Sequence, residues 1–224
     1  MSGPELSEPP VSAARPWDRS RLPVVPRWVG LIALVVVLLG TSAWVIGQQF
    51  SSSATHHAPK DTLAPTSSYS RFQDPTATFR VGYPPTWKRV LTNNPQLVLL
   101  AEGPHGASFQ VAETKITAPV DAANLASAKK LTERVVKEGP QVKLIPLRYH
   151  QPEEISLGDL PGYLYLYTFV DPTTGETGAH AHYFLFDGKT MITLVFQSLP
   201  STNFVSLSPL FDRIASTFHA LPAH

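Results

Sequence analysis

The 224-residue chain contains no cysteine. It therefore forms no disulfide, uses no thiolate as a metal ligand or nucleophile, and carries no lipid on an N-terminal cysteine. An excess of charge of one sign is also lacking, because 18 lysines and arginines oppose 17 acidic residues and leave a net charge of +1. Nucleic-acid binding requires a surplus of basic residues on one face, so we expect no nucleic-acid partner.

Motifs of several enzyme classes are also missing. No Gly-x-Ser-x-Gly sequence indicates a hydrolase nucleophile, and the glycines fall at single turns instead of in a phosphate-binding loop. Glu153 and Glu154 are paired carboxylates in sequence, but adjacent side chains usually diverge and suit a solvated edge better than glycoside cleavage. We expect no catalytic residue, no cofactor and no enzyme activity.

One long uncharged stretch lies near the N-terminus. Residues 28–46 hold no charge in 19 positions, and eleven of these are Val, Leu or Ile. As a helix this stretch would span roughly 28 Å, which matches a bilayer hydrocarbon core of about 30 Å. Trp28 and Trp44 stand at its ends, where indole rings favour the membrane interface. The pattern predicts a transmembrane helix over residues 28–47, with the lipid bilayer as a partner.

Basic residues flank this stretch closely on one side only. Four arginines occur within residues 15–27, whereas the first basic residue after the stretch is Lys60. Because basic flanks stay in the cytoplasm, we expect a single-pass protein of the cell membrane with a cytoplasmic N-terminus and an extracellular C-terminal domain. The alternative is a signal peptide cleaved near Ala43 or Ala54, although the leader and the apolar run both exceed the usual lengths.

Composition divides the rest of the chain into three parts. Residues 1–27 hold six prolines and few large apolar side chains, which predicts a disordered cytoplasmic tail. Residues 48–71 are rich in Ser, Thr, Pro and His and predict a flexible linker. Residues 72–224 predict one folded extracytoplasmic domain.

Strand and helix patterns alternate within this domain. A helical period predicts a helix over residues 122–137 with Asp121 as its cap, and Ser208 and Pro209 are expected to begin a second helix. We expect an α+β fold in which helices pack against a central antiparallel sheet. Apolar alternation and turn residues, including Asp187-Gly188, predict strands over residues 78–83, 87–91, 97–101, 107–114, 141–147, 155–157, 163–170, 179–186 and 189–197.

Two histidines are candidate metal ligands. His180 and His182 alternate along an expected strand, so both imidazoles point to one face and could bind one metal ion. No third strong ligand is near, because Glu176 is the one neighbouring acid, and histidines lining a partly apolar surface are the alternative. We therefore expect no metal site and keep this pair as candidates for a metal-assisted envelope hydrolase.

Three tyrosines are candidates for a ligand groove. Tyr163, Tyr165 and Tyr167 share one face of an expected strand. Such a stripe can line a groove for a ligand, or it can be a sheet face packed under a helix.

Three short motifs carry a family resemblance. They are Phe-Arg-Val-Gly-Tyr-Pro-Pro-Thr-Trp at residues 79–87, Leu-Gly-Asp-Leu-Pro-Gly at residues 157–162, and Ser-Thr-Phe at residues 216–218. Together they resemble the PsbP-like superfamily, particularly its exported actinobacterial members of the LpqN type. The resemblance implies an α/β/α sandwich with a central antiparallel sheet and a noncatalytic binding or accessory role. LpqN-type proteins are usually anchored through a lipidated cysteine, which the transmembrane helix would replace here.

These observations predict a membrane-anchored, extracytoplasmic, noncatalytic binding or accessory module of the cell envelope. Its expected partner is an envelope protein or a small ligand, met at raised effective concentration near the bilayer. Besides the hydrolase, the alternative is a ligand sensor that signals to the cytoplasmic tail.

Overall fold

The computed structural model describes residues 65–73, 78–138, 152–171 and 174–221. The expected tail, transmembrane helix and most of the linker lie outside these residues, as does the expected strand at 141–147. Among the described residues, no helix combines the length and the apolar character needed to cross a bilayer.

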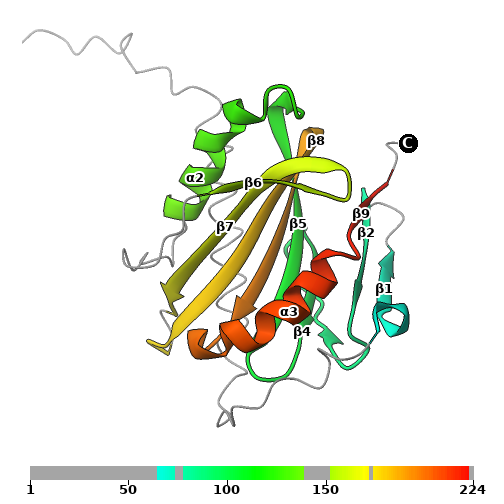
Figure 1. Ribbon diagram of the computed structural model, residues 1–224, viewed down its shortest axis with the longest axis vertical. Helices are drawn as coiled ribbons and strands as arrows, with labels where there is room; N and C mark the ends of the chain where they lie inside the picture. The colour runs from blue at the N-terminus through cyan, green and yellow to red at the C-terminus, as the bar shows by residue number, and fades with distance from the viewer. Residues whose placement is uncertain (1–64, 74–77, 139–151, 172–173, 222–224) are drawn as a thin grey trace, which may run out of the picture.

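Six antiparallel strands form the larger of the two sheets (Figure 1), in the order β3-β4-β5-β8-β7-β6. The longest strand, β8, is a hairpin whose first arm pairs with β7 and whose second arm pairs with β5. The chain reverses near Gly188, which has a φ of 54°, in line with the expected turn. The strands are β3 (Lys88–Arg89), β4 (Leu97–Glu102), β5 (Ala107–Val120), β6 (Glu153–Leu157), β7 (Leu160–Val170) and β8 (Thr177–Ser198).

The remaining three strands form a separate small sheet, in the order β1-β2-β9. They are β1 (Ser70–Gln73), β2 (Phe79–Tyr83) and β9 (His219–Ala220). The sequence predicted one central sheet, so this second sheet is a correction. The expected linker was also too long, because β1 begins before residue 72 and Tyr69 is already buried.

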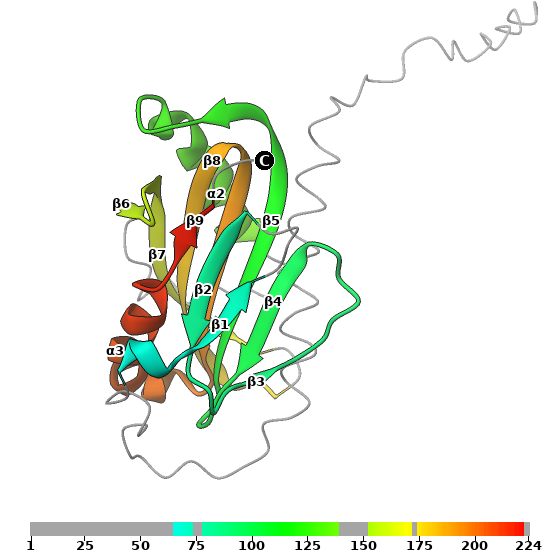
Figure 2. The ribbon, with the colours of Figure 1, turned by 90° about the vertical axis from the view of Figure 1, so that its right-hand side faces the viewer.

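Helices cover both faces of the large sheet, as the α+β expectation required. Helix α2 (Lys129–Glu138) lies over one face, and α3 (Phe204–Ala215) lies over the other together with the small sheet (Figure 2). The expected helix at 122–137 begins with a 3-10 turn, η4 (Leu125–Ala128). Asp121 is therefore not the helix cap that the sequence predicted, because Asn124 stands at the N-cap of η4 without a side-chain cap bond. Asp121 Oδ1 instead accepts the amide protons of Ala123 and Asn124, at 2.9 and 3.1 Å, in the turn before η4.

The second helix begins earlier than the sequence predicted. Helix α3 starts at Phe204, so Ser208 is not its cap and Pro209 lies inside it. Proline lacks the N–H that would bond the carbonyl of Val205 four residues before it. The hydroxyl of Ser208 donates to that carbonyl at 3.0 Å instead, so the carbonyl keeps a hydrogen-bond partner within the helix.

Two hydrophobic cores lie on the two sides of the large sheet. Successive side chains of β8 point to opposite faces of the sheet and so enter the two cores in turn. Tyr183 and Leu185 face α3 and the small sheet, and Phe184 and Phe186 face α2. All four side chains are buried. The sheet is therefore the middle layer that holds α2 on one side and the small sheet on the other.

We expect Gly106→Ala to lower the free energy of unfolding by more than about 3 kcal/mol. A Cβ at this position would overlap the backbone carbonyl of Leu199, and the φ of 71° is strained for any L residue. Gly188→Ala is the matched control, since its φ is also positive but open space surrounds it, so the cost is about 1 kcal/mol. Urea unfolding of the two variants measures the difference. Equal losses would contradict the close contact at Gly106.

Candidate functional site

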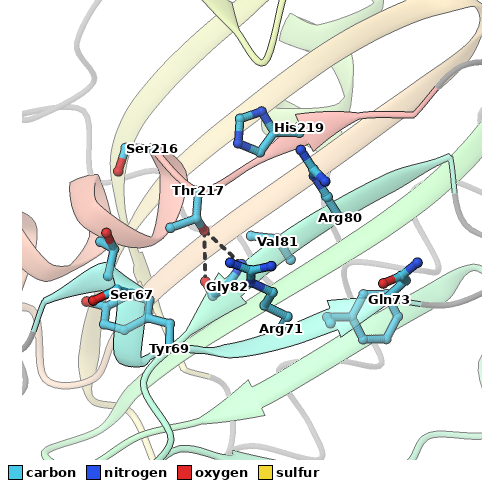
Figure 3. A pocket seen from close by; sticks show the side chains of 12 residues that line it. Ser67, Tyr69, Arg71, Gln73, Arg80, Val81, Gly82, Ser216, Thr217 and His219 are labelled. Carbon is cyan, nitrogen blue, oxygen red and sulfur yellow. Dashed lines mark hydrogen bonds between the residues drawn. The ribbon is translucent and has the colours of Figure 1, made fainter.

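A pocket of about 370 Å³ opens on the outer face of the small sheet (Figure 3). Twelve residues line it, contributed by η3 (Thr66–Ser68), β1, β2 and the segment from α3 to β9. Neither expected candidate set contributes to this lining. A volume in this range suits a small-molecule group or a headgroup rather than a large ligand.

Strand alternation decides which side chains reach the pocket. Phe72 and Val81 are register partners and point into the core, where they are 3% and 2% exposed. Their neighbours Arg71 and Arg80 therefore point outward, and both side chains are exposed. His219 of β9 lies opposite Arg80 and completes an outward-facing row across the three strands.

Aromatic stacking beneath the strands fixes this small sheet to the core. The Phe79 ring stacks on Phe72 and on Phe218, with centroids 5.7 Å apart in both pairs. Phe218 precedes β9 directly, so the same stack holds the C-terminal strand beside β2. The pocket thus rests on buried aromatic rings instead of on a loop.

Thr217 completes the strand ladder at the centre of the pocket. Pairing of β2 with β9 covers only Phe79 and Arg80. Beyond it, the Thr217 hydroxyl accepts a hydrogen bond from the Gly82 amide at 2.8 Å and lies 3.1 Å from the Gly82 carbonyl oxygen (Figure 3). The Thr217 hydroxyl therefore satisfies the Gly82 amide, and its single proton lies between the carbonyls of Gly82 and Ile214, of which Ile214 is nearer at 2.6 Å. The lack of a side chain at Gly82 allows this close approach, since a Cβ there would lie 3.3 Å from both Thr217 Oγ1 and Tyr69 Cβ.

Both formally charged side chains of this pocket, Arg71 and Arg80, are positive. Its lining includes Arg71, Arg80 and His219, and no aspartate or glutamate is part of it. Within the described part of the chain, neither arginine forms an ion pair. The arrangement offers many N–H and O–H donors and can bind a polar ligand rich in acceptor atoms.

The three candidate tyrosines lie elsewhere, on the sheet face beneath α2. Tyr163, Tyr165 and Tyr167 are 0%, 0% and 5% exposed, so they do not line an open groove. The Tyr165 hydroxyl lies 2.6 Å from that of Thr132 in α2, and the Tyr163 hydroxyl donates to the carbonyl of Leu125 at 3.2 Å. Their surroundings are those of a sheet face packed under a helix.

The structure brings Tyr167 together with both candidate histidines. The Tyr167 hydroxyl lies 3.1 Å from His180 Nδ1 and 3.0 Å from His182 Nδ1. His180 Nε2 lies 2.8 Å from the acceptor Gln197 Oε1 and therefore carries the proton. His180 Nδ1 then accepts the Tyr167 O–H, and His182 Nδ1 donates to the Tyr167 oxygen. Both nitrogens of His180 are thus occupied by hydrogen bonds.

Burial favours the neutral form of both histidines. Loss of hydration lowers the pKa of His180 to about 4, although the hydrogen bond to Gln197 opposes this shift. Burial, and secondarily the nearby His180, lowers the pKa of His182 well below 6.5. Among the described residues, no three potential ligands group together around a possible metal position.

A polar band on the same sheet face was not predicted. Glu102 Oε1, Gln110 Oε1 and His182 Nε2 are buried without a hydrogen-bond partner. Gln110 of β5 lies opposite Val195 of β8. Gln197, whose Oε1 accepts the hydrogen bond from His180, stands two residues after Val195 and so lies on the same face. Burial raises the pKa of Glu102, and Lys88 on the paired strand lowers it less. Alternation alone could have indicated this band, but only the register joins residues from three strands.

Comparison with solved structures identifies the fold. The domain is similar to cyanobacterial PsbP (CyanoP) from Synechocystis sp. PCC 6803, with a TM-score of 0.53 and 16% identity over 76% of this chain and 98% of that one. LpqN of Mycobacterium tuberculosis, which is involved in cell envelope biogenesis, gives a TM-score of 0.46 and 13% identity over 68% of this chain and 91% of that one. No family model and no curated protein matches the chain. The fold is PsbP-like, which confirms that part of the sequence-based expectation.

We expect acid to destabilise the domain through the neutral histidine pair. Unfolded histidines titrate near pH 6.5, so below that pH the unfolded state binds more protons than the folded state. Stability is complete above about pH 6.5 and falls toward pH 4 by up to about 1.4 kcal/mol per pH unit for each histidine. Urea unfolding of the full chain between pH 8 and pH 4 measures this slope.

A double variant, His180→Gln with His182→Phe, should flatten that slope. His219→Gln removes an exposed histidine and is the matched control, which we expect to keep the native profile. An unchanged slope in the double variant would show that other groups cause the acid sensitivity.

Proposed function

We propose that this protein is a noncatalytic binding or accessory module of the cell envelope that takes its ligand in the pocket on the small sheet. The observation that carries the proposal is the pocket itself, a concave and donor-rich surface built on regular strands. The strand pairing fixes the backbone positions of Arg71 and Arg80 before a ligand arrives, so no loop has to be ordered on binding.

Membrane attachment is the second part of the proposal. It rests on the sequence, because residues 28–47 have the length and apolar character of a spanning helix and the arginines before them favour a cytoplasmic N-terminus. The domain would then face the outside of the cell, with residues 48–64 joining it to the anchor. The LpqN-type, actinobacterial assignment rests likewise on the sequence motifs.

Photo-crosslinking from the pocket tests the binding function. A photoreactive amino acid replacing Gln73, an exposed residue of the lining, should give a discrete adduct in native membranes because it faces the bound ligand. Leu91 is the control position, since it is 85% exposed and not part of the lining. Mass spectrometry identifies the adduct. Equal labelling from both positions, or no adduct at Gln73, would contradict a binding pocket.

Protease treatment of intact cells tests the membrane topology. We expect added protease to digest the C-terminal domain while the N-terminal tail stays protected and remains in the membrane fraction. Antibodies against each part follow the two products. Protection of the domain while an external control protein is digested, or recovery of the whole chain as soluble material, would contradict the proposed anchor.

A further inference from the structure

We infer that Arg71 and Arg80 bind the phosphate group of an anionic lipid headgroup in this pocket, an inference that rests on the proposed binding function. The two side chains come from diagonal positions, because Arg71 lies opposite Gly82 and Arg80 stands two residues before Gly82. Diagonal neighbours on antiparallel strands are about 7–8 Å apart. Two arginine side chains can converge on one ligand group over that separation.

The charge of the pocket selects an anion. No acidic side chain lines it, and neither arginine has an ion-pair partner among the described residues. Guanidinium groups that approach each other from these two positions repel, and an anion placed between them would replace repulsion with two attractive interactions. The pocket therefore favours a charged ligand group over a neutral one of equal size.

The distribution of donors favours phosphate among anions. Guanidinium groups bind both carboxylate and phosphate through paired N–H bonds. Phosphate has more acceptor oxygens and can use donors from several directions. The pocket supplies them, because the hydroxyl residues Thr66 and Ser67 are part of its lining and His219 lies opposite Arg80 on the neighbouring strand. A carboxylate would leave several of these donors without an acceptor.

The position of the pocket along the chain favours a lipid as the source of the phosphate. Thr66 and Ser67 belong to η3, the helical turn that precedes β1. The composition of residues 48–64 predicts a random coil, whose r.m.s. reach would be roughly 23 Å, so the proposed anchor would keep the pocket on average within a few tens of ångströms of the membrane surface. Lipid headgroups would meet the pocket at a high effective concentration.

Native mass spectrometry of the full-length chain in neutral detergent tests the inference. Phosphatidylglycerol is the anionic lipid, phosphatidylcholine is the zwitterionic control, and inorganic phosphate and glycerol 3-phosphate are the free phosphates. We expect the native chain to bind its first phosphatidylglycerol at least about tenfold more tightly than phosphatidylcholine. The variant R71Q/R80Q should lose this preference.

A charge-matched control separates the pocket from general attraction between the protein and lipids. K129Q/K130Q also removes two positive charges, but from exposed positions on α2, beyond the other face of the large sheet. It should keep the full preference. If R71Q/R80Q proves unstable, Gln73→Trp fills the pocket without changing its charge and should abolish the preference as well.

Three results would overturn the inference. In the first, the native chain binds the two lipids with equal affinity. In the second, the preference for phosphatidylglycerol survives in R71Q/R80Q. In the third, free phosphate at equal concentration displaces phosphatidylglycerol, which would make free phosphate the ligand. Each leaves the proposed binding function standing if Gln73 still forms its own adduct in native membranes. Absence of any adduct from Gln73 would refute the binding function itself.

Discussion

Burial of both faces of the β8 hairpin is the constraint on which the rest of the structure depends. Its two arms pair with β7 and β5, so this one segment joins the halves of the large sheet. Successive residues such as Phe184 and Leu185 enter different cores. The segment must therefore be apolar on both faces, and two layers must cover it. Helix α2 forms one layer, and α3 with the small sheet forms the other.

The candidate pocket is a consequence of that second layer. The small sheet turns Phe79 inward to stack on Phe72 and Phe218, and the same alternation turns Arg71 and Arg80 outward. The core thereby determines which side chains face the pocket. The sheet face under α2 differs, because the polar groups of its tyrosines and histidines form hydrogen bonds with the helix or with one another.

Local pattern predicted the elements better than it predicted their partners. The alternation at residues 79–83 correctly predicted a strand. It did not predict that this strand belongs to a separate sheet, because its partner strands begin at residue 70 and at residue 219. Ser208 and Pro209 resembled a helix start because serine and proline favour that position. The helix begins at Phe204 instead, and within it the Ser208 hydroxyl bonds the carbonyl that the proline leaves unpaired.

By itself, the sequence determined the α+β class, the antiparallel strands and the positions of most turns, because each depends on residues adjacent in the chain. It also identified His180, His182 and Tyr167 as notable, but gave them separate roles. Only the tertiary structure joined these three side chains in one network, and only it placed Arg71 beside Arg80 and Thr217. Such groupings arise from strand register and from packing between distant segments, which no local periodicity encodes.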